Sequence, residues 1–150
     1  MRLELALELQ ISLGPRMHIH LAEGCTRGAV LIEQGSFSGP GISGTVVQGS
    51  GGDFPLVQPD GNGRFESQYL LRTDDGAFIL KRSTGVRHAP PEVVARLLAR
   101  EEVDPASYYM RMTPRFEAPA GPYEWLNRTI FVGVGQRNPS GSLFRYWKVV

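Results

Sequence analysis

One ten-residue stretch decides the fold class: Tyr108-Tyr109-Met110-Arg111-Met112-Thr113-Pro114-Arg115-Phe116-Glu117. In an extended strand, successive side chains point to opposite faces. One face therefore carries the hydrogen-bonding side chains Tyr109, Arg111, Thr113, Arg115 and Glu117, and the other is mainly apolar. The polar face is either solvated surface or the lining of a polar cavity. We predict a β-strand whose Arg111 and Glu117 face a barrel interior, while Met110, Met112 and Phe116 pack outward.

Turn signals recur about every ten residues on both sides of this stretch, which is the spacing of an all-β sandwich or barrel. They combine residues that tolerate or preset turn geometry, at Gly14-Pro15, Glu23-Gly24, Gly39-Pro40-Gly41, 49–53, 59–63, Asp74-Asp75-Gly76, 119–122 and 138–141. Nine strand-like runs lie between them: 3–13, 17–21, 29–37, 42–47, 64–73, 77–82, 108–117, 125–134 and 142–149. Because an open sheet would expose its edges, we predict an all-β fold, a closed or nearly closed antiparallel β-barrel.

One short α-helix is predicted after Pro90-Pro91, since proline is accepted at the first helical position. Four apolar residues recur on one helical stripe of segment 92–101: Val93, Val94, Leu97 and Leu98. We expect this helix to lie across the mouth or the wall of the barrel. At 150 residues, without repeats or linkers, the chain is expected to form one domain over residues 1–150.

The composition argues against several classes of protein. A formal net charge of +1 gives no overall attraction to nucleic acid, and no apolar run approaches the length of a membrane span. The charged N-terminal alternation and the lone Cys25 fit a cytoplasmic protein. Of the 16 basic residues only Lys81 and Lys148 are lysines. Arginine suits the recognition of carboxylates and phenolates, although a codon bias would explain the same excess.

The segment Gly49-Ser50-Gly51-Gly52-Asp53 has the composition of a flexible loop that ends in a carboxylate. Glycines free such a loop to move and let backbone amides approach a ligand. At a cavity rim beside arginines, Asp53 would serve as a general base if its environment tunes its pKa. As an ordinary turn residue it needs no function.

Two further predicted strands carry candidate binding residues. Tyr69 and Thr73 share one face and Asp74 lies on the other, a mixed pattern that suits a barrel lumen or a solvated edge strand. Trp125 and Asn127 share a face of a later strand. They would form the floor of a flat-ligand site, or they are a structural Trp and a capping Asn.

Two motifs fail on their context. His18-Ile19-His20 near Cys25 has some features of a metal site, but no further ligands follow at a recognisable spacing, so we expect no metal. Gly133-Val134-Gly135 follows a strand but leads to a turn rather than to a helix, so it is no dinucleotide-binding loop. We therefore expect no cofactor.

The chain resembles the domain-of-unknown-function family numbered 3237. The resemblance rests on Gly35-Ser36-Phe37-Ser38-Gly39-Pro40, Gly51-Gly52-Asp53, 69–76, 108–111, 113–117, Trp125-Leu126-Asn127 and Phe131-Val132-Gly133. It covers nearly the whole chain and implies a small antiparallel barrel, somewhat like a lipocalin and often paired as a dimer. Leu80 departs from the family, which tends to have an aromatic residue there. The resemblance marks as cavity candidates Asp53, Asp74, Arg111, Glu117, Trp125 and Asn127.

The predicted function is a small-molecule-binding barrel, in its catalytic form a cofactor-independent cyclase, isomerase or lyase for an apolar or aromatic metabolite. Asp53 or Glu117 would move the proton and Arg111 would hold an anionic oxygen. The substrate-binding candidates are Tyr69, Thr73, Asp74, Tyr109, Thr113, Trp125 and Asn127. A non-catalytic carrier and a structural dimer with a filled lumen are the alternatives. A ligand-binding lumen should have roughly 300 Å³ or more of open space, and we expect a homodimer without nucleic-acid or membrane partners.

Overall fold

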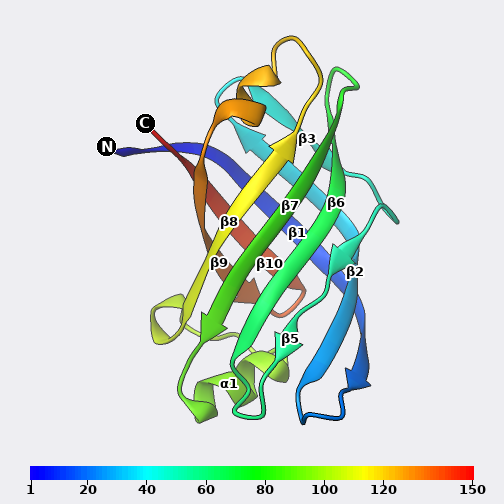
Figure 1. Cartoon of the computed structure of the whole chain (residues 1–150), viewed down its shortest axis with the longest axis vertical. Helices are drawn as coiled ribbons and strands as arrows, with labels where there is room; N and C mark the ends of the chain where they lie inside the picture. The colour runs from blue at the N-terminus through cyan, green and yellow to red at the C-terminus, as the bar shows by residue number, and fades with distance from the viewer.

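The computed structural model describes residues 1–150 and forms a closed ring of antiparallel strands (Figure 1). The strands are β1 (Leu3–His20), β2 (Thr26–Gly39), β3 (Ile42–Val46), β4 (Gly52–Asp53), β5 (Leu56–Val57), β6 (Gly63–Thr73), β7 (Phe78–His88), β8 (Tyr109–Glu117), β9 (Phe131–Asn138) and β10 (Gly141–Val149). The ring runs β1-β10-β9-β8-β7-β6, after which the short β3, β4 and β5 join β6 to β2, and β2 pairs with β1. The predicted antiparallel β-barrel is confirmed.

The longest strand, β1, replaces two predicted strands and the turn predicted between them. Gly14-Pro15 lies inside β1, where the pairing with β2 changes register between Ser12 and Arg16. Proline has no N–H to give to a ladder and is accepted in a sheet at such an irregularity. The turn predicted at Gly14-Pro15 was therefore wrong, and the pair marks a bulge instead.

The faces of β8 are the reverse of those predicted. Met110 and Phe116 are buried in the barrel, while Arg111 and Glu117 are exposed on its outer surface. Phe116 packs edge-on against Phe131, with 5.1 Å between the ring centroids. Burying the charged side chains of this strand without partners would raise the free energy of the folded state, whereas burying its apolar side chains lowers it. The predicted inward direction of Arg111 and Glu117 was wrong.

One α-helix, α1 (Pro91–Leu98), lies at one end of the barrel, the lower end in Figure 1. Its Val94 and Leu97 are buried, and Leu97 belongs to the main apolar core. Two short 3₁₀-helices are also present, η1 (Pro105–Ser107) and η2 (Glu124–Arg128). The strand predicted over 125–134 begins only at residue 131, because η2 occupies its first part. No helix of the chain is both long enough and apolar enough to cross a membrane.

Candidate functional site

A polar group of side chains lies inside the barrel among apolar ones. Asp53 of β4, Ser67 and Tyr69 of β6, Lys81 of β7 and Arg137 of β9 line one cavity of about 20 Å³. The cavity's apolar walls are Ile11, Leu13, Ile32, Phe65, Met110, Met112 and Phe144. This volume has room for about one water molecule. The lumen of this structure is therefore nearly filled, and it lacks the open space expected of a ligand-binding barrel.

Lys81 is 1% exposed, which is rare for a lysine without a carboxylate partner. Its Nζ donates to Ser67 Oγ at 2.9 Å and to Tyr69 Oη at 3.1 Å, and lies 4.4 Å from the centroid of the Tyr69 ring. Burial lowers the pKa of Lys81 to about 7, and the charge of Asp53 opposes that shift only in part. The neutral amine and the ammonium ion are consequently both populated near neutral pH.

Asp53 reaches the lumen because β4 passes directly between two longer strands. Gly52 pairs with both β2 and β6, and a Cβ on Gly52 would lie 2.3 Å from the carbonyl oxygen of Val30. Only glycine permits this close approach of β4 to the backbone of β2. The prediction that Asp53 ends a loop at the barrel rim was therefore wrong, since β4 holds Asp53 on the barrel wall, where it lines the lumen cavity.

The carboxyl group of Asp53 has few hydrogen-bonding or charged partners to offset its burial. Its Oδ1 is buried without a hydrogen-bond partner, and its Oδ2 lies 4.0 Å from Nη2 of Arg137. Burial raises the pKa of Asp53, an effect that the charges of Arg137 and Lys81 partly oppose. Burial thus disfavours both the carboxylate form of Asp53 and the ammonium form of Lys81, a combination that is common in proton-transfer sites.

Two hydroxyl groups of β10 lie at or near this cavity: Ser142 lines it, and the ring centroid of Tyr146 lies 5.7 Å from Nζ of Lys81. The buried side-chain oxygens of Tyr146 and Ser142 have no hydrogen-bond partner. Burial raises the pKa of Tyr146 well above its ordinary value, with Tyr69 and Asp53 adding to the shift, so Tyr146 remains a phenol that can donate. Buried polar groups are nearly always bonded in native proteins, and a cluster of unbonded ones indicates a site for a ligand or for water.

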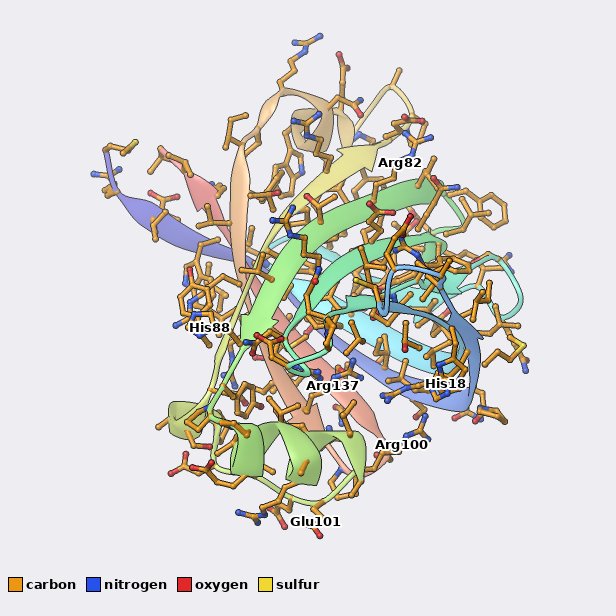
Figure 2. All side chains as sticks on the ribbon, turned by 60° about the horizontal axis from the view of Figure 1, so that its bottom comes forward. His18, Arg82, His88, Arg100, Glu101 and Arg137 are labelled. Carbon is orange, nitrogen blue, oxygen red and sulfur yellow. The ribbon has the colours of Figure 1, made fainter.

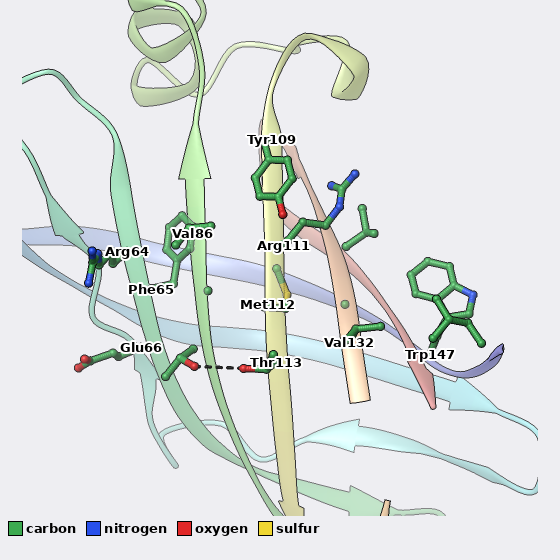
Figure 3. A pocket seen from close by; sticks show the side chains of 15 residues that line it. Arg64, Phe65, Glu66, Val86, Tyr109, Arg111, Met112, Thr113, Val132 and Trp147 are labelled. Atoms are coloured by element: carbon green, nitrogen blue, oxygen red, sulfur yellow. Dashed lines mark hydrogen bonds between the residues drawn. The ribbon is translucent and has the colours of Figure 1, made fainter. Parts of the chain in front are cut away.

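The structure brings together only some of the predicted site residues. Asp53 and Tyr69 meet in the lumen. Three others, Tyr109, Arg111 and Thr113, line a groove of about 890 Å³ on the outer face of the barrel (Figure 3). The guanidinium of Arg111 lies 4.8 Å from the centroid of the Tyr109 ring. These three residues therefore share a pocket, but one that faces solvent.

The remaining candidates lie apart from the lumen cavity. Thr73 is buried at the β6–β7 hairpin, where its hydroxyl bonds to the hairpin backbone. Asp74 is exposed and accepts a hydrogen bond from Ser43, and Glu117 is exposed and paired with Arg82. None of the three lines the lumen cavity.

Trp125 and Asn127 lie on η2 rather than on a strand. The Asn127 side chain bonds both the N–H and the carbonyl of Ala118, at 2.8 and 2.9 Å. The Trp125 ring lies 6.0 Å from that of Phe131. This arrangement matches the alternative interpretation, a structural Trp and a capping Asn.

Several polar residues in or beside the lumen cavity were not among the predicted site residues, namely Lys81, Arg137, Tyr146 and the serines Ser67, Ser83 and Ser142. A signal for Lys81 was present, because it alternates with Ile79 and Ser83 on the buried face of β7. A lysine on the apolar face of a strand is unusual enough to indicate a site. No comparable signal marks Arg137 or Tyr146.

The sequence matches one protein family over nearly its full length, residues 1–149, and that family is described as "Protein of unknown function (DUF3237)". The chain belongs to this family. A UPF0311 protein of Clostridium acetobutylicum is 36% identical over 123 residues, 82% of this chain and 77% of that protein. A UPF0311 protein of Rhodopseudomonas palustris is 38% identical over 112 residues, 75% of this chain and 72% of that protein. The resemblance inferred from the sequence is confirmed.

Solved structures show the same architecture. The crystal structure of a conserved protein of unknown function from Rhodopseudomonas palustris has a TM-score of 0.93 and 30% identity, covering 100% of this chain and 99% of that one. A protein of Acinetobacter baumannii described as β-barrel like has a TM-score of 0.84 and 30% identity, covering 98% and 94%. An enzyme from Penicillium herquei has a TM-score of 0.73 over 99% of this chain and 94% of its own, at 21% identity. At that identity the likeness concerns the fold alone.

Proposed function

We propose that the barrel lumen is an active site that moves protons on a small, largely apolar or aromatic molecule, as a cyclase, isomerase or lyase. One observation carries this proposal. A lysine whose pKa burial lowers to about 7 shares an apolar cavity with a carboxyl group whose pKa burial raises. Pairs of groups whose environments shift their pKa values in this way are typical of general acid–base catalysis.

Lys81 would act as the base in such a reaction. Its neutral amine takes a proton from a hydroxyl group or an acidic carbon of the bound molecule, and the hydroxyls of Tyr69 and Tyr146 stabilise the resulting oxyanion by donating hydrogen bonds. The ammonium, or the protonated carboxyl group of Asp53, then delivers a proton to a different atom. In an isomerisation this second transfer protonates a different carbon as the double bond moves, and in an elimination it protonates the leaving group. In a cyclisation the oxyanion first adds to an activated carbon–carbon double bond, which breaks the π bond, and the resulting carbanion takes the proton. When Asp53 is the donor, the ammonium of Lys81 returns a proton to its carboxylate, so both groups regain their starting states and no oxidant or reductant is consumed.

The nearly filled lumen has to open before such a molecule can enter. α1 is the element suited to move, because it is only 8 residues long and no side chain caps its N-terminus. Inside the barrel, Met110 and Met112 pack against Gly135, where a Cβ would lie within 3.0 Å of both side chains. Methionine side chains adapt readily to new surroundings. Displacement of α1 and of these two side chains would enlarge the cavity.

A filled, structural lumen is the second candidate, and the cavity volume of about 20 Å³ favours it. In that case Asp53, Tyr69 and Lys81 form an internal polar network that fixes the packing of the barrel. A non-catalytic carrier would need the same enlargement of the lumen cavity as an enzyme. It would not need an acid and a base with shifted pKa values.

We propose a homodimer as the assembly of this chain. The groove on the outer face gathers apolar side chains of several strands, among them Leu3 of β1. Val86 and Trp147 of the same groove are labelled in Figure 3. Leu3 is 55% and Val86 is 42% exposed. A second copy related by a two-fold axis is the commonest way to cover such a patch. This basis replaces the sequence-based one, which placed the apolar face of β8 on the outside.

The function can be tested without knowing the natural substrate. The protein is incubated in D₂O with a panel of phenols, enones and β-dicarbonyl compounds, and mass spectrometry follows deuterium incorporation at carbon. We expect acceleration over buffer of about 10²-fold or more for at least one compound, the usual scale of general acid–base catalysis. Lys81→Met should abolish it, while Lys148→Met, a change of the other lysine on the outer surface, should not. Equal rates for the wild type, Lys81→Met and buffer across the panel would reject the acid–base function and favour the structural lumen.

A further inference from the structure

Guanidinium groups gather at the end of the barrel beside α1. Arg16 comes from β1, Arg87 from β7 and Arg137 from β9, and Arg100 follows α1. Figure 2 shows Arg100 and Arg137 at this end. Burial lowers the pKa of Arg87 to about 10, and the charges of Arg137 and Arg16 add to the shift. Arg16, Arg100 and Arg137 line one cavity of about 10 Å³. Burial lowers the pKa of Arg16 and Arg137, and the charge of Arg100 adds to that lowering. We call these four residues the arginine cluster.

Negative charge near the cluster is scarce. Asp53 lies 4.0 Å from Arg137, a loose ion pair, and burial favours its neutral form. Glu101 borders the same end of the barrel, but its carboxylate is paired with Arg96. Neither Arg16 nor Arg87 takes part in an ion pair with a carboxylate of the chain. Uncompensated buried charge is costly, so the arrangement indicates a missing anion.

Two of the guanidinium groups also have unused donors. The Nε atoms of Arg16 and Arg87 are buried without a hydrogen-bond partner. Arg87 is only 3% exposed, and the hydrogen bond of its side chain goes to the carbonyl of Gly61 at 3.3 Å. An orphaned donor on a charged, buried side chain needs an acceptor that the folded chain does not supply.

Arg100 adds backbone strain at the same place. It is the one non-glycine residue with positive φ, at 56°, just after the end of α1. Glycine is the usual residue there, because a side chain in this conformation is strained. The Arg100 side chain crosses to β1 and donates from Nη2 to the carbonyl of Gly14 at 2.9 Å. Strain of this kind is typical of functional positions.

We propose that the arginine cluster binds the carboxylate of an organic acid whose apolar body extends into the lumen. The inference rests on the proposed function and names the substrate class of that site. Guanidinium groups match a carboxylate with two parallel hydrogen bonds. Arg87 and Arg137 both lie over the ring of Phe65, at 5.7 and 6.0 Å from its centroid, and Phe65 also lines the lumen cavity. The arginine cluster therefore borders the apolar wall of the lumen cavity at Phe65. A site with charged donors beside an apolar wall suits an organic acid better than a free inorganic anion, because the apolar body of the acid can contact that wall.

The test compares benzoate, its neutral counterpart benzamide, and inorganic phosphate as probes, by calorimetry and by the thermal unfolding midpoint. We expect benzoate to bind at least 10-fold more tightly than the other two and to raise the midpoint. Arg16→Gln and Arg137→Gln should each weaken benzoate at least 10-fold. Arg82→Gln, which changes an exposed arginine paired with Glu117 on the outer surface, should leave benzoate affinity unchanged.

Lys81→Met separates this inference from the proposed function, because it should abolish proton transfer while benzoate still binds. If proton transfer is absent in the wild type while benzoate still binds, the carboxylate site is supported and only the proposed function is rejected. If proton transfer is observed in the wild type but benzoate does not bind, only the carboxylate site is rejected. Equal binding of benzoate and benzamide, or tighter binding of phosphate, overturns the carboxylate assignment. If an arginine variant fails to fold, the benzoate–benzamide comparison on the wild type still decides.

Discussion

The amine of Lys81 lies 3.1 Å from the hydroxyl of Tyr69 inside the barrel. The two residues are directly paired across β6 and β7, so their side chains project from the same face of the sheet into the lumen. Burial disfavours the ammonium form of Lys81 and the phenolate form of Tyr69 alike. The contact is therefore stable as a bond between neutral groups, and it places a basic nitrogen beside a phenol that can donate.

The protonation of Lys81 can be observed directly. We expect its side-chain amine to titrate with a pKa of about 7, because burial disfavours the ammonium ion. The chain has only two lysines, so ¹³C-labelled lysine gives two sets of NMR signals, and Lys81→Met assigns them. A Lys81 signal that stays in the charged state through pH 9 would contradict the assignment of this residue as a base.

The same shift predicts how stability depends on pH. The pKa of Lys81 falls from 10.5 in the unfolded chain to about 7 in the folded one. Between these values the unfolded state binds a proton that the folded state lacks, so the free energy of unfolding rises with pH. The rise from this group is at most about 1.4 kcal/mol per pH unit, and below pH 7 its contribution stays at its lowest.

Urea unfolding at a series of pH values measures this slope. Lys81→Met should flatten it relative to the wild type, and Lys148→Met should retain it. An unchanged slope in Lys81→Met would show that other groups cause the pH dependence.

The position of Asp53 depends on the glycine before it. In Gly52→Ala the new methyl group would lie 2.3 Å from the carbonyl oxygen of Val30, so β4 has to move and Asp53 with it. We expect a loss of about 1–3 kcal/mol in unfolding free energy, the scale of overpacking. Gly63→Ala is the matched control, since its nearest neighbour would be 3.7 Å away. Equal stability of the two variants would disprove the close packing of β4.

The homodimer is predicted to bury the outer groove. Light scattering at micromolar concentration should give twice the mass of the 16.5 kDa chain. Val86→Asp, in the groove, should shift the protein to monomers, because an unpaired carboxylate would be buried in the interface. Leu31→Asp changes an equally exposed residue of β2 that lies outside the groove, and should leave the mass unchanged. A monomeric wild type would rule the dimer out.

Much of the fold could be predicted from the sequence, because turn chemistry is local. Hairpins at Glu23-Gly24 and Asp75-Gly76 form where the sequence indicated them. Gly14-Pro15 was misassigned as a turn, because the same two residues are compatible with a turn or with a β-bulge. Which of the two forms depends on the pairing with β2, which the local sequence does not show. The segment that forms β8 was also predicted to be a strand. Alternation, however, defines the two faces of a strand without saying which face points into the barrel.

The site was harder to predict, because it depends on contacts between distant segments. Asp53 was identified from its glycine-rich context, although as a rim residue rather than as part of the lumen. Lys81 and Arg137 come from strands far apart in the sequence, and only barrel closure brings them to the same cavity. The excess of arginine was noticed, but no sequence pattern could show that four of these residues gather at one end of the barrel.

The pH dependence of deuterium incorporation into a bound carbon acid tests the central claim most directly. If the neutral amine of Lys81 is the base, the wild-type rate should rise with pH and level off above a midpoint near the lysine pKa of about 7. Lys81→Met should lower the rate to that of buffer, and Asp53→Asn should lower it by about 10²-fold. A wild-type rate that equals buffer at every pH, or one that Lys81→Met leaves unchanged, would contradict the account.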